Sequence, residues 1–358
     1  MSASDLTSDA VRLAALHRRM DENSLGGHWQ DRERSQKLVP VLWPWSAIEP
    51  CLMEAAEVVK LGHAEEANNR RTINLVNPSL AARKSTSRTL QMSVQLVNPG
   101  ENAEAHRHTP AAIRFVVEGD GIGYTNVEGE QMSMEAGDLI LTPNWTWHDH
   151  VNPGKKPLIW LDVLDVHMVN LFDAMTFESY PGAPGSNQLF QPVTKQEGDS
   201  RRRLGVVRTP RGAHDGSALP YCYKWRDTLS ALEERAAAGD SDPHDGILLE
   251  YANPVSGGPT LPTFSCRVQY LAPGTATRPQ RHTGSVILHV VRGAGTARVG
   301  AKQGEEQELA WGKRDCFFVP SMDWHCFANR SETEPAILFS VSDSPVLRGL
   351  GLYREEKA

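Results

Sequence analysis

The sequence contains two copies of one long segment, and this repeat limits the folds open to the chain more than any other feature. RHTPAAIRFVVEGDGIGYT, which begins at Arg107, aligns at a constant offset with RHTGSVILHVVRGAGTARV, which begins at Arg281. Two shorter blocks repeat beside it: VQLVNPG returns as VQYLAPG, and TPNWTWHDHVN returns as VPSMDWHCFAN. A repeat of this length indicates two copies of one structural unit.

Each copy has the pattern of short β-strands. In the first copy, Ile113, Phe115 and Val117 alternate with Arg114 and Val116, which is typical of an extended segment with two different faces. Glycine and proline residues separate this segment from its neighbours and permit tight corners between strands. We therefore predict an all-β chain built from two small antiparallel β-barrels.

Three histidines of the first copy form the strongest chemical pattern. His106 and His108 are two residues apart, so on a strand their side chains project from one face. A later strand, 139–142, leads to His148 and brings it to the same neighbourhood if the sheet closes. A histidine pair alone is common and usually only polar, but three converging imidazoles make a metal site. They suit iron, zinc, copper or nickel better than magnesium or calcium.

The second copy lacks several polar side chains of the first. The residues His106, Arg114 and His150 are replaced, in that order, by Gln280, Leu288 and Phe327. His282 and His325 remain, and with Gln280 they could hold a metal only weakly. We therefore predict that the first barrel carries the chemistry and that the second serves folding and oligomer contacts.

Composition excludes several classes of partner. The chain has 358 residues and a formal net charge of -7, which does not favour nucleic acid or an anionic membrane. No stretch approaches the roughly 20 apolar residues that cross a bilayer, and the N-terminus does not resemble a secretory signal. The 5 cysteines are odd in number and show no CxxC pattern, so we expect reduced thiols and a cytoplasmic location.

We expect five parts along the chain. They are a helical and extended arm at 1–88, the catalytic barrel at 89–170, a connector with a helix at 171–250, the degenerate barrel at 251–347 and a tail at 348–358. Helices are predicted at 10–20, at 50–59 and at 228–238, the last introduced by Asp227 and ended by Gly239.

The spacing of the first copy resembles the two motifs of the cupin superfamily. Gly100, Gly119, Gly137, Pro143 and Asn152 stand at the expected distances around the histidines. The glutamate of the motif is absent, because its place falls on an alanine or isoleucine at 112–113. Three segments resemble the gentisate 1,2-dioxygenase family, which includes salicylate and 1-hydroxy-2-naphthoate ring-cleaving enzymes. They are HRHTPAAIRFVVEGDG, TPNWTWHDHVNPG and WLDVLD.

This resemblance implies a jelly-roll-like bicupin with an N-terminal helical extension and a partly helical connector. It implies one Fe(II) per chain, held by His106, His108 and His148 in the first barrel. The reaction expected is insertion of both atoms of O2 between the carboxyl- and hydroxyl-bearing carbons of gentisate, which gives maleylpyruvate. A substituted gentisate, salicylate or 1-hydroxy-2-naphthoate is the alternative substrate, and a homotetramer is the expected assembly.

Further side chains are candidates for substrate contacts. Arg114 has the parity of the ligands, so it can point inward and bind a carboxylate in bidentate fashion. His150 shares a face with His148, and Asp162 shares one with Trp160; in the family the residues matching His150 and Asp162 contact substrate hydroxyl groups and help to move protons. The resemblance also adds Arg70, Gln95 and Gln91. Because Arg71 is adjacent, the alternation of side chains does not decide whether Arg70 or Arg71 points toward the substrate. Gln91 stands where the family usually has an aromatic residue.

Two other functions share this fold. An oxalate-type manganese bicupin or a sugar isomerase would keep the glutamate ligand, and the oxalate type keeps ligands in both halves. A storage or sensor bicupin would lose histidines in both halves. The intact first set, with Arg114, His150 and Asp162 around it, favours the dioxygenase.

Overall fold

The computed structural model describes residues 3–27, 29, 37–59, 61, 70–181, 191–199, 221–253 and 256–358. The chain divides into two units, Met1–Lys37 and Leu38–Ala358. The first unit contains one helix, α1 (Ala3–Glu22), which extends beyond both ends of the helix predicted at 10–20. None of the helices in the described ranges is long and apolar enough to cross a membrane.

The first barrel consists of two facing antiparallel sheets. One has the strand order β12-β8-β5-β10-β3-β2 and the other the order β11-β4-β9-β6-β7. Its strands are β2 (Thr72–Asn74), β3 (Gln91–Val97), β4 (Asn102–His108), β5 (Ala112–Glu118), β6 (Asp120–Val127), β7 (Glu130–Glu135), β8 (Leu139–Thr142), β9 (His148–Val151), β10 (Leu158–Leu164), β11 (Phe177–Ser179) and β12 (Tyr221–Tyr223).

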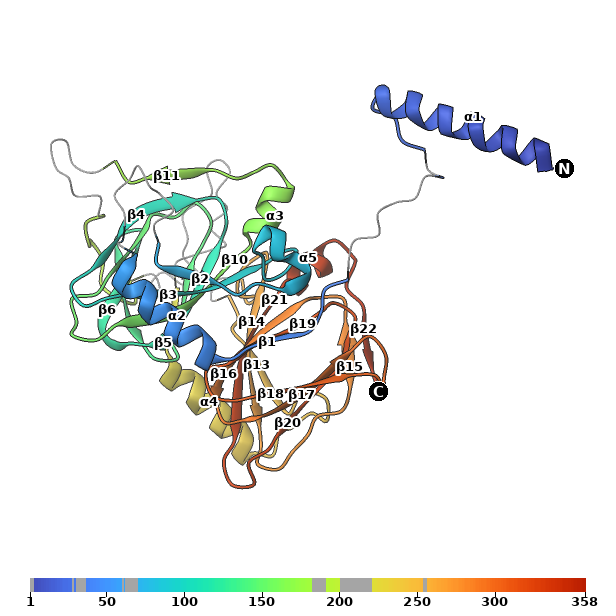
Figure 1. The fold of residues 1–358 in the computed structure, drawn as a ribbon. Coiled ribbons are helices and arrows are strands. Elements are labelled where there is room, and N and C mark those ends of the chain that lie inside the picture. Colours follow the sequence, from blue (N-terminus) through green and yellow to red (C-terminus); the bar gives the residue numbers. More distant parts are fainter. Residues whose placement is uncertain are drawn as a thin grey trace. The chain divides into compact units, whose positions relative to one another are not determined.

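The second barrel repeats this plan. Its sheets have the orders β1-β19-β16-β21-β14-β13 and β18-β17-β20-β15-β22. Its strands are β1 (Val41–Trp43), β13 (Ile247–Glu250), β14 (Ser265–Leu271), β15 (Gln280–His282), β16 (Val286–Arg292), β17 (Gly295–Gly300), β18 (Gln307–Trp311), β19 (Cys316–Val319), β20 (Trp324–Asn329), β21 (Ala336–Ser342) and β22 (Glu355–Lys357). The prediction of two antiparallel barrels is confirmed (Figure 1).

One continuous core joins the two barrels. Side chains alternate along β5, so Phe115 faces the second barrel while its neighbour Arg114 faces the interior of the first. The rings of Phe115 and Phe339, one from each barrel, stack with centroids 4.1 Å apart. The sheet that carries β5 thus has an apolar face toward the other barrel and a polar face toward the site.

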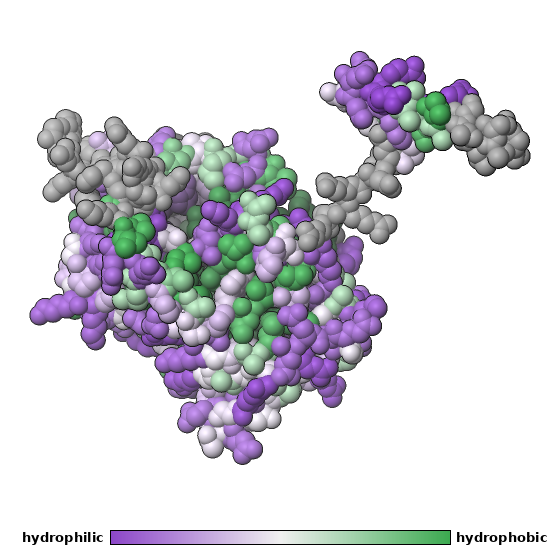
Figure 2. Space-filling view, viewed as in Figure 1, coloured by the Kyte–Doolittle hydropathy of each residue, from purple (hydrophilic) through white to green (hydrophobic). Residues whose placement is uncertain are grey.

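The N-terminal arm and the connector exchange strands between the barrels. β1 pairs with β19 of the second barrel, although β2, which follows it, pairs with β3 of the first. In the connector, β12 pairs with β8 of the first barrel and β13 with β14 of the second. Figure 2 shows green, apolar side chains gathered in the middle of one face, around α2 (Trp45–Val58) and β1.

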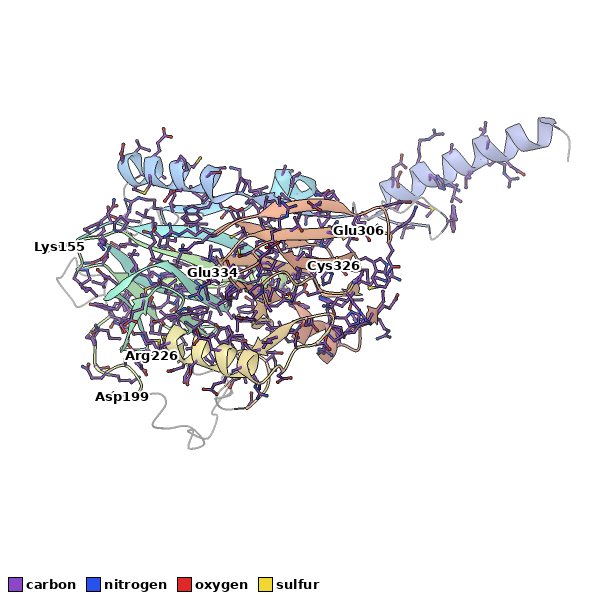
Figure 3. The ribbon with its side chains drawn as sticks, turned by 90° about the horizontal axis from the view of Figure 1, so that it is seen from below. Lys155, Asp199, Arg226, Glu306, Cys326 and Glu334 are labelled. Carbon is purple, nitrogen blue, oxygen red and sulfur yellow. The ribbon has the colours of Figure 1, made fainter. Side chains whose placement is uncertain are left out.

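The helices begin where distant contacts place them. α2 starts before the predicted 50–59, so Pro50 lies inside it. α4 (Trp225–Ala237) starts before the predicted Thr228, and Asp138 of the first barrel accepts a hydrogen bond from the Trp225 N–H at 2.9 Å. Figure 3 shows α2 and α4 on opposite sides of the barrels, with Arg226 labelled at the start of α4. The other helices are α3 (Val166–Leu171), α5 (Ser344–Gly349) and the 3-10 helix Pro78–Arg83.

Candidate metal centre and substrate pocket

Two neighbouring strands bring the three histidines together. β4 carries His106 and His108, β9 carries His148, and His106 lies directly across from His148 in the strand pairing. Two residues of β4, Glu104 and Ala105, oppose one residue of β9 just before this pair, so the ladder contains a β-bulge. Ligand nitrogens of the three histidines lie within 4.8 Å of one another. Among the described residues, no other group of three histidine, cysteine or acidic side chains meets this condition.

Hydrogen bonds orient the histidine rings. Nδ1 of His108 lies 2.7 Å from the carbonyl oxygen of Pro110, and Nδ1 of His148 lies 2.9 Å from that of Thr146. Nδ1 of His106 lies 3.2 Å from the carbonyl oxygen of Glu104. A ring that donates Nδ1–H to a carbonyl keeps Nε2 as a free ligand atom, which is the usual arrangement around a protein-bound metal. Nε2 of His148 is buried and has no protein partner. The group fits a metal ion.

Burial keeps these imidazoles neutral, which metal binding requires. Desolvation lowers the pKa of His108 to about 4 and lowers the pKa values of His106 and His148 well below the ordinary range. Nearby Arg70 and Arg114 act in the same direction, because their positive charges oppose protonation of the rings.

Arg114 and Asp162 form a buried pair beside the histidines. They face each other on β5 and β10, with Nε of Arg114 3.7 Å from Oδ1 of Asp162. Nη1 of Arg114 also donates a hydrogen bond to Oγ1 of Thr142. Burial lowers the pKa of Arg114, and Asp162 opposes that shift. Neither Arg114 Nε nor Asp162 Oδ1 has a hydrogen-bond partner, so both can still contact a ligand.

Arg70 and Arg71 have different surroundings. Nη2 of Arg70 contacts the His106 ring and donates to the carbonyl oxygen of Glu104 at 2.9 Å. Burial, followed by repulsion from Arg114, lowers the pKa of Arg70 to about 10. Arg71 instead forms an ion pair with Glu101 at 2.6 Å and donates to the carbonyl oxygen of Val59. Arg70 is therefore the arginine that faces the histidines.

His150, Trp160 and Gln95 complete this polar region. The rings of His150 and Trp160 lie 4.8 Å apart, and Nδ1 of His150 lies 2.9 Å from Oγ1 of Thr125. Burial lowers the pKa of His150 well below the ordinary range, so this ring is neutral as well. Six buried polar atoms have no protein partner here, and they belong to Gln95, Arg114, His148, His150, Trp160 and Asp162. Buried polar atoms are normally paired, so this concentration marks a ligand pocket.

Gln91 differs from the other predicted pocket residues because its amide is already bonded. Its Oε1 accepts a hydrogen bond from Nε2 of His167 at 3.1 Å and one from the Thr86 N–H at 3.3 Å. Its Nε2 donates to the carbonyl oxygen of Met92 at 2.9 Å. A polar group at this position is held in place by its neighbours.

Thr125 and Thr142, which contact His150 and Arg114, were not among the residues predicted from the sequence. Their hydroxyl groups lie across the sheets from side chains that the repeat had already singled out. Their spacing in the sequence gives no signal of either contact, because both depend on the pairing of strands.

Fold and site together define a bicupin whose first barrel contains a three-histidine group that fits a metal ion. Comparison with a cupin-domain family profile gives matches at residues 93–164 and 267–342. The 5-aminosalicylate 1,2-dioxygenase of Comamonas sp is 38% identical over 96% of this chain and 90% of its own length. The gentisate 1,2-dioxygenase 1 of Aquipseudomonas alcaligenes is 36% identical over 89% of this chain and 87% of its own.

A solved structure agrees with these sequences. The salicylate 1,2-dioxygenase of Pseudoaminobacter salicylatoxidans, crystallised with gentisate, has a TM-score of 0.82 and 30% identity, and the match covers 97% of this chain and 94% of that one. The chain belongs to the gentisate 1,2-dioxygenase-like family of bicupin ring-cleaving dioxygenases. Its substrates are accordingly an aromatic acid and O2.

Proposed function

We propose that the chain cleaves gentisate between its carboxyl- and hydroxyl-bearing carbons, inserts both atoms of O2 and so forms maleylpyruvate. The observation that carries this proposal is the position of the buried Arg114–Asp162 pair beside the three-histidine group, among polar atoms that lack protein partners. A carboxylate with an adjacent hydroxyl group complements an arginine and a metal ion side by side.

The metal proposed is one Fe(II) per chain, held by His106, His108 and His148. Iron would supply the redox chemistry that couples the aromatic ring to O2. Because the three ligands are neutral, the full charge of the ion stays available to attract an anionic substrate. Arg70 and Arg114 add two positive charges against the single carboxylate of Asp162. The centre is thus electrostatically suited to a substrate that chelates as a dianion.

Within the pocket each side chain has a proposed task. Arg114 binds the carboxylate of the substrate, and Arg70 is placed to neutralise negative charge beside His106. Neutral His150 and the carboxylate of Asp162 accept or return the hydroxyl protons of the substrate. Gln95 and Trp160, each with a free N–H, hydrogen-bond to oxygen atoms of the ligand.

A second candidate substrate is 5-aminosalicylate, or another salicylate with a polar group at that ring position. The relative that is 38% identical over 96% of this chain acts on 5-aminosalicylate. The polar Gln91–His167 pair replaces the aromatic residue usual in the family and could lie beside a ring substituent. Salicylate and 1-hydroxy-2-naphthoate follow as further alternatives.

Oxygen uptake by iron(II)-loaded protein tests the reaction and ranks the acids. Gentisate, salicylate, 5-aminosalicylate and 1-hydroxy-2-naphthoate are each supplied under identical conditions, and the products are identified by mass spectrometry with 18O2. Fastest uptake with gentisate, with two labelled atoms in the product, supports the first proposal. Fastest uptake with another acid would identify that acid as the substrate. If protein that holds iron consumed no oxygen with any of the acids, ring cleavage would be contradicted.

We also propose a homotetramer and a cytoplasmic location. All five cysteines are free thiols, which suits a reducing compartment. Light scattering on the purified protein should give four times the chain mass of 39.5 kDa. A mass of one or two chains would refute the tetramer without affecting the proposed reaction.

A further inference from the structure

The second barrel contains its own cavity where the first has the metal centre. The cavity has a volume of about 280 Å³, and Gln280, His282 and His325 line it at the positions of the three metal ligands. Gln269 and Ser340 line it at the positions of Gln95 and Asp162. This barrel has kept an internal space, whereas a purely structural copy would gain stability by filling it with side chains.

The inner wall of this cavity has changed from polar to apolar. Leu288 and Phe327 stand at the positions of Arg114 and His150, and Leu248 and Val286 line the cavity beside them. The cavity therefore offers an apolar surface to one side of a ligand. Its polar groups are concentrated on the remaining sides.

In the second barrel an arginine stands on β14, which is separated by β21 from the strand that carries Leu288. Arg267 on β14 stands at the position of Ser93 and pairs across the sheet with Ser340, as Ser93 pairs with Asp162. Nε of Arg267 is buried and makes no hydrogen bond, although Glu250 lies 3.4 Å away. Although the second barrel has no counterpart of Arg114, it therefore still contains an arginine that can bind an anion.

A second arginine, Arg348 on α5, also lines the cavity. Its guanidinium lies over the ring of Tyr353 at 3.6 Å from the centroid. Three carboxylates also line the cavity, and each has a partner: Asp245 accepts from Gln280 at 2.6 Å, Glu355 accepts from the Tyr353 hydroxyl at 3.0 Å, and Glu250 accepts from the Ser265 hydroxyl at 2.8 Å. Asp245 and Glu355 also lie 3.6 Å from Nζ of Lys357. The two arginines therefore keep donors for an incoming anion.

The imidazoles complete the site without a metal. Nε2 of Gln280 donates to Asp245 and to the carbonyl oxygen of His244, so this side chain is tied down. His282 and His325 both line the cavity, with ring centroids 5.5 Å apart. A free imidazole nitrogen can bond to a hydroxyl group.

We propose that the second barrel binds a small hydroxylated aromatic carboxylate without a metal. Its carboxylate pairs with Arg267 and Arg348, its ring packs on Leu288 and Phe327, and its hydroxyl group bonds to His282. Such a ligand resembles the proposed substrate, but this binding does not depend on which acid the first barrel cleaves. The second barrel would then be a sensor of the compounds that the first barrel consumes.

Equilibrium dialysis of radiolabelled salicylate against the full-length chain under nitrogen tests this site. The first barrel is silenced by His106→Ala and Arg114→Leu together, and the protein is kept free of iron with a chelator. We expect one salicylate per chain to remain bound. Adding Arg267→Leu should weaken this binding by roughly tenfold or more, whereas the control Arg281→Leu, which alters a half-buried arginine of β15 that pairs with Glu356 outside the cavity lining, should not change it.

Further variants separate loss of the site from loss of the fold. His282→Phe keeps a ring in place but removes the bond to the hydroxyl group, so salicylate should bind about fivefold more weakly while benzoate is unaffected. Circular dichroism confirms that each variant is folded. Absence of salicylate binding in the silenced protein would overturn the proposal, as would binding that appears only with added iron. Neither result would bear on cleavage in the first barrel, which oxygen uptake measures separately.

Discussion

Backbone carbonyl groups select the nitrogen that two of the three histidines, His108 and His148, offer to a metal. Pro110 and Thr146 accept from the Nδ1 atoms of His108 and His148, which leaves Nε2 of both rings directed at the centre. In the second barrel the carbonyl oxygen of Asp323 lies 3.1 Å from Nδ1 of His325 in the same way. The difference between the barrels therefore lies in side chains, above all in the change of His106 to Gln280.

Exchanging that one side chain in each barrel should have unequal effects. His106→Ala removes one of three ligands and should abolish both iron retention and turnover. Gln280→Ala removes a side chain that bonds Asp245, and both quantities should stay nearly unchanged. Metal analysis and oxygen uptake on the two purified variants provide the measurement. Comparable loss of iron from the Gln280 variant would contradict a single iron site per chain.

Some residue assignments could be read from the sequence and others could not. The histidines and Arg114 follow from alternation along strands, and the structure brings them together. Arg70 and Arg71 are adjacent, and only the ion pair of Arg71 with Glu101 shows which one is free to face His106. The bulge at Glu104 and Ala105 could not be predicted from the sequence either, because a bulge is a property of two paired strands.

Asp165 should make stability depend on pH in a defined direction. Burial raises its pKa to about 6, so the folded chain holds this proton more tightly than the unfolded chain does. The contribution of Asp165 to stability is full below about pH 4 and is lost as the pH rises to about 6. Relative to the wild type, Asp165→Asn should gain about 2 kcal/mol over this interval.

Urea unfolding at pH 4 and at pH 7 measures this difference. The control Asp240→Asn removes an exposed carboxylate that pairs with Arg235, and its stability relative to the wild type should differ between the two values by less than about 1 kcal/mol. An Asp165→Asn variant whose relative stability falls as the pH rises would refute the assignment.

Among the elements, α4 shows how a distant residue sets a boundary. The predicted start at Thr228 relied on Asp227, a residue nearby in the sequence. The observed start depends on Asp138 in the first barrel, which bonds the Trp225 N–H and forms an ion pair with Lys224 at 2.9 Å. No local pattern contains that information, whereas the strands were predictable because their alternation is local.

Asp138→Ala should therefore destabilise the protein by about 3 kcal/mol, because it leaves the buried Lys224 ammonium with fewer partners. Glu197, 3.0 Å from Lys224, limits the loss. Arg235→Ala breaks a well-exposed ion pair with Asp240 and should cost less than about 1 kcal/mol. Urea unfolding followed by circular dichroism compares the two, and equal costs would contradict the role given to Asp138.

At the scale of the whole molecule, the repeat predicted the architecture, but the union of the two barrels was not predictable. Their shared core is built from the outward faces of two sheets, with Phe115 against Phe339. A sequence shows that such faces are apolar and leaves open which surface covers them. The pairing of β1 with the second barrel and of β12 with the first likewise joins residues that are far apart in the sequence.

Because the core is continuous, both barrels should unfold in one transition. Phe339→Ala, at a fully buried position, should cost about 4 kcal/mol and lower the temperature of that single transition. Iron should raise the same temperature, since it binds only the folded state. Differential scanning calorimetry tests both expectations. Two transitions, of which iron shifts only one, would show that the barrels unfold independently; the exposed Phe172→Ala serves as the control.

The pairing of β1 with β19 also has a consequence for synthesis on the ribosome. Trp45, just after β1, hydrogen-bonds Asp315 across a separation of 270 residues. At elongation rates of about 5 to 20 residues per second this corresponds to a delay of roughly 14 to 54 s. The nascent chain can complete the strands of the three-histidine barrel during that time, but β1 must stay unpaired until β19, in the last eighth of the chain, emerges.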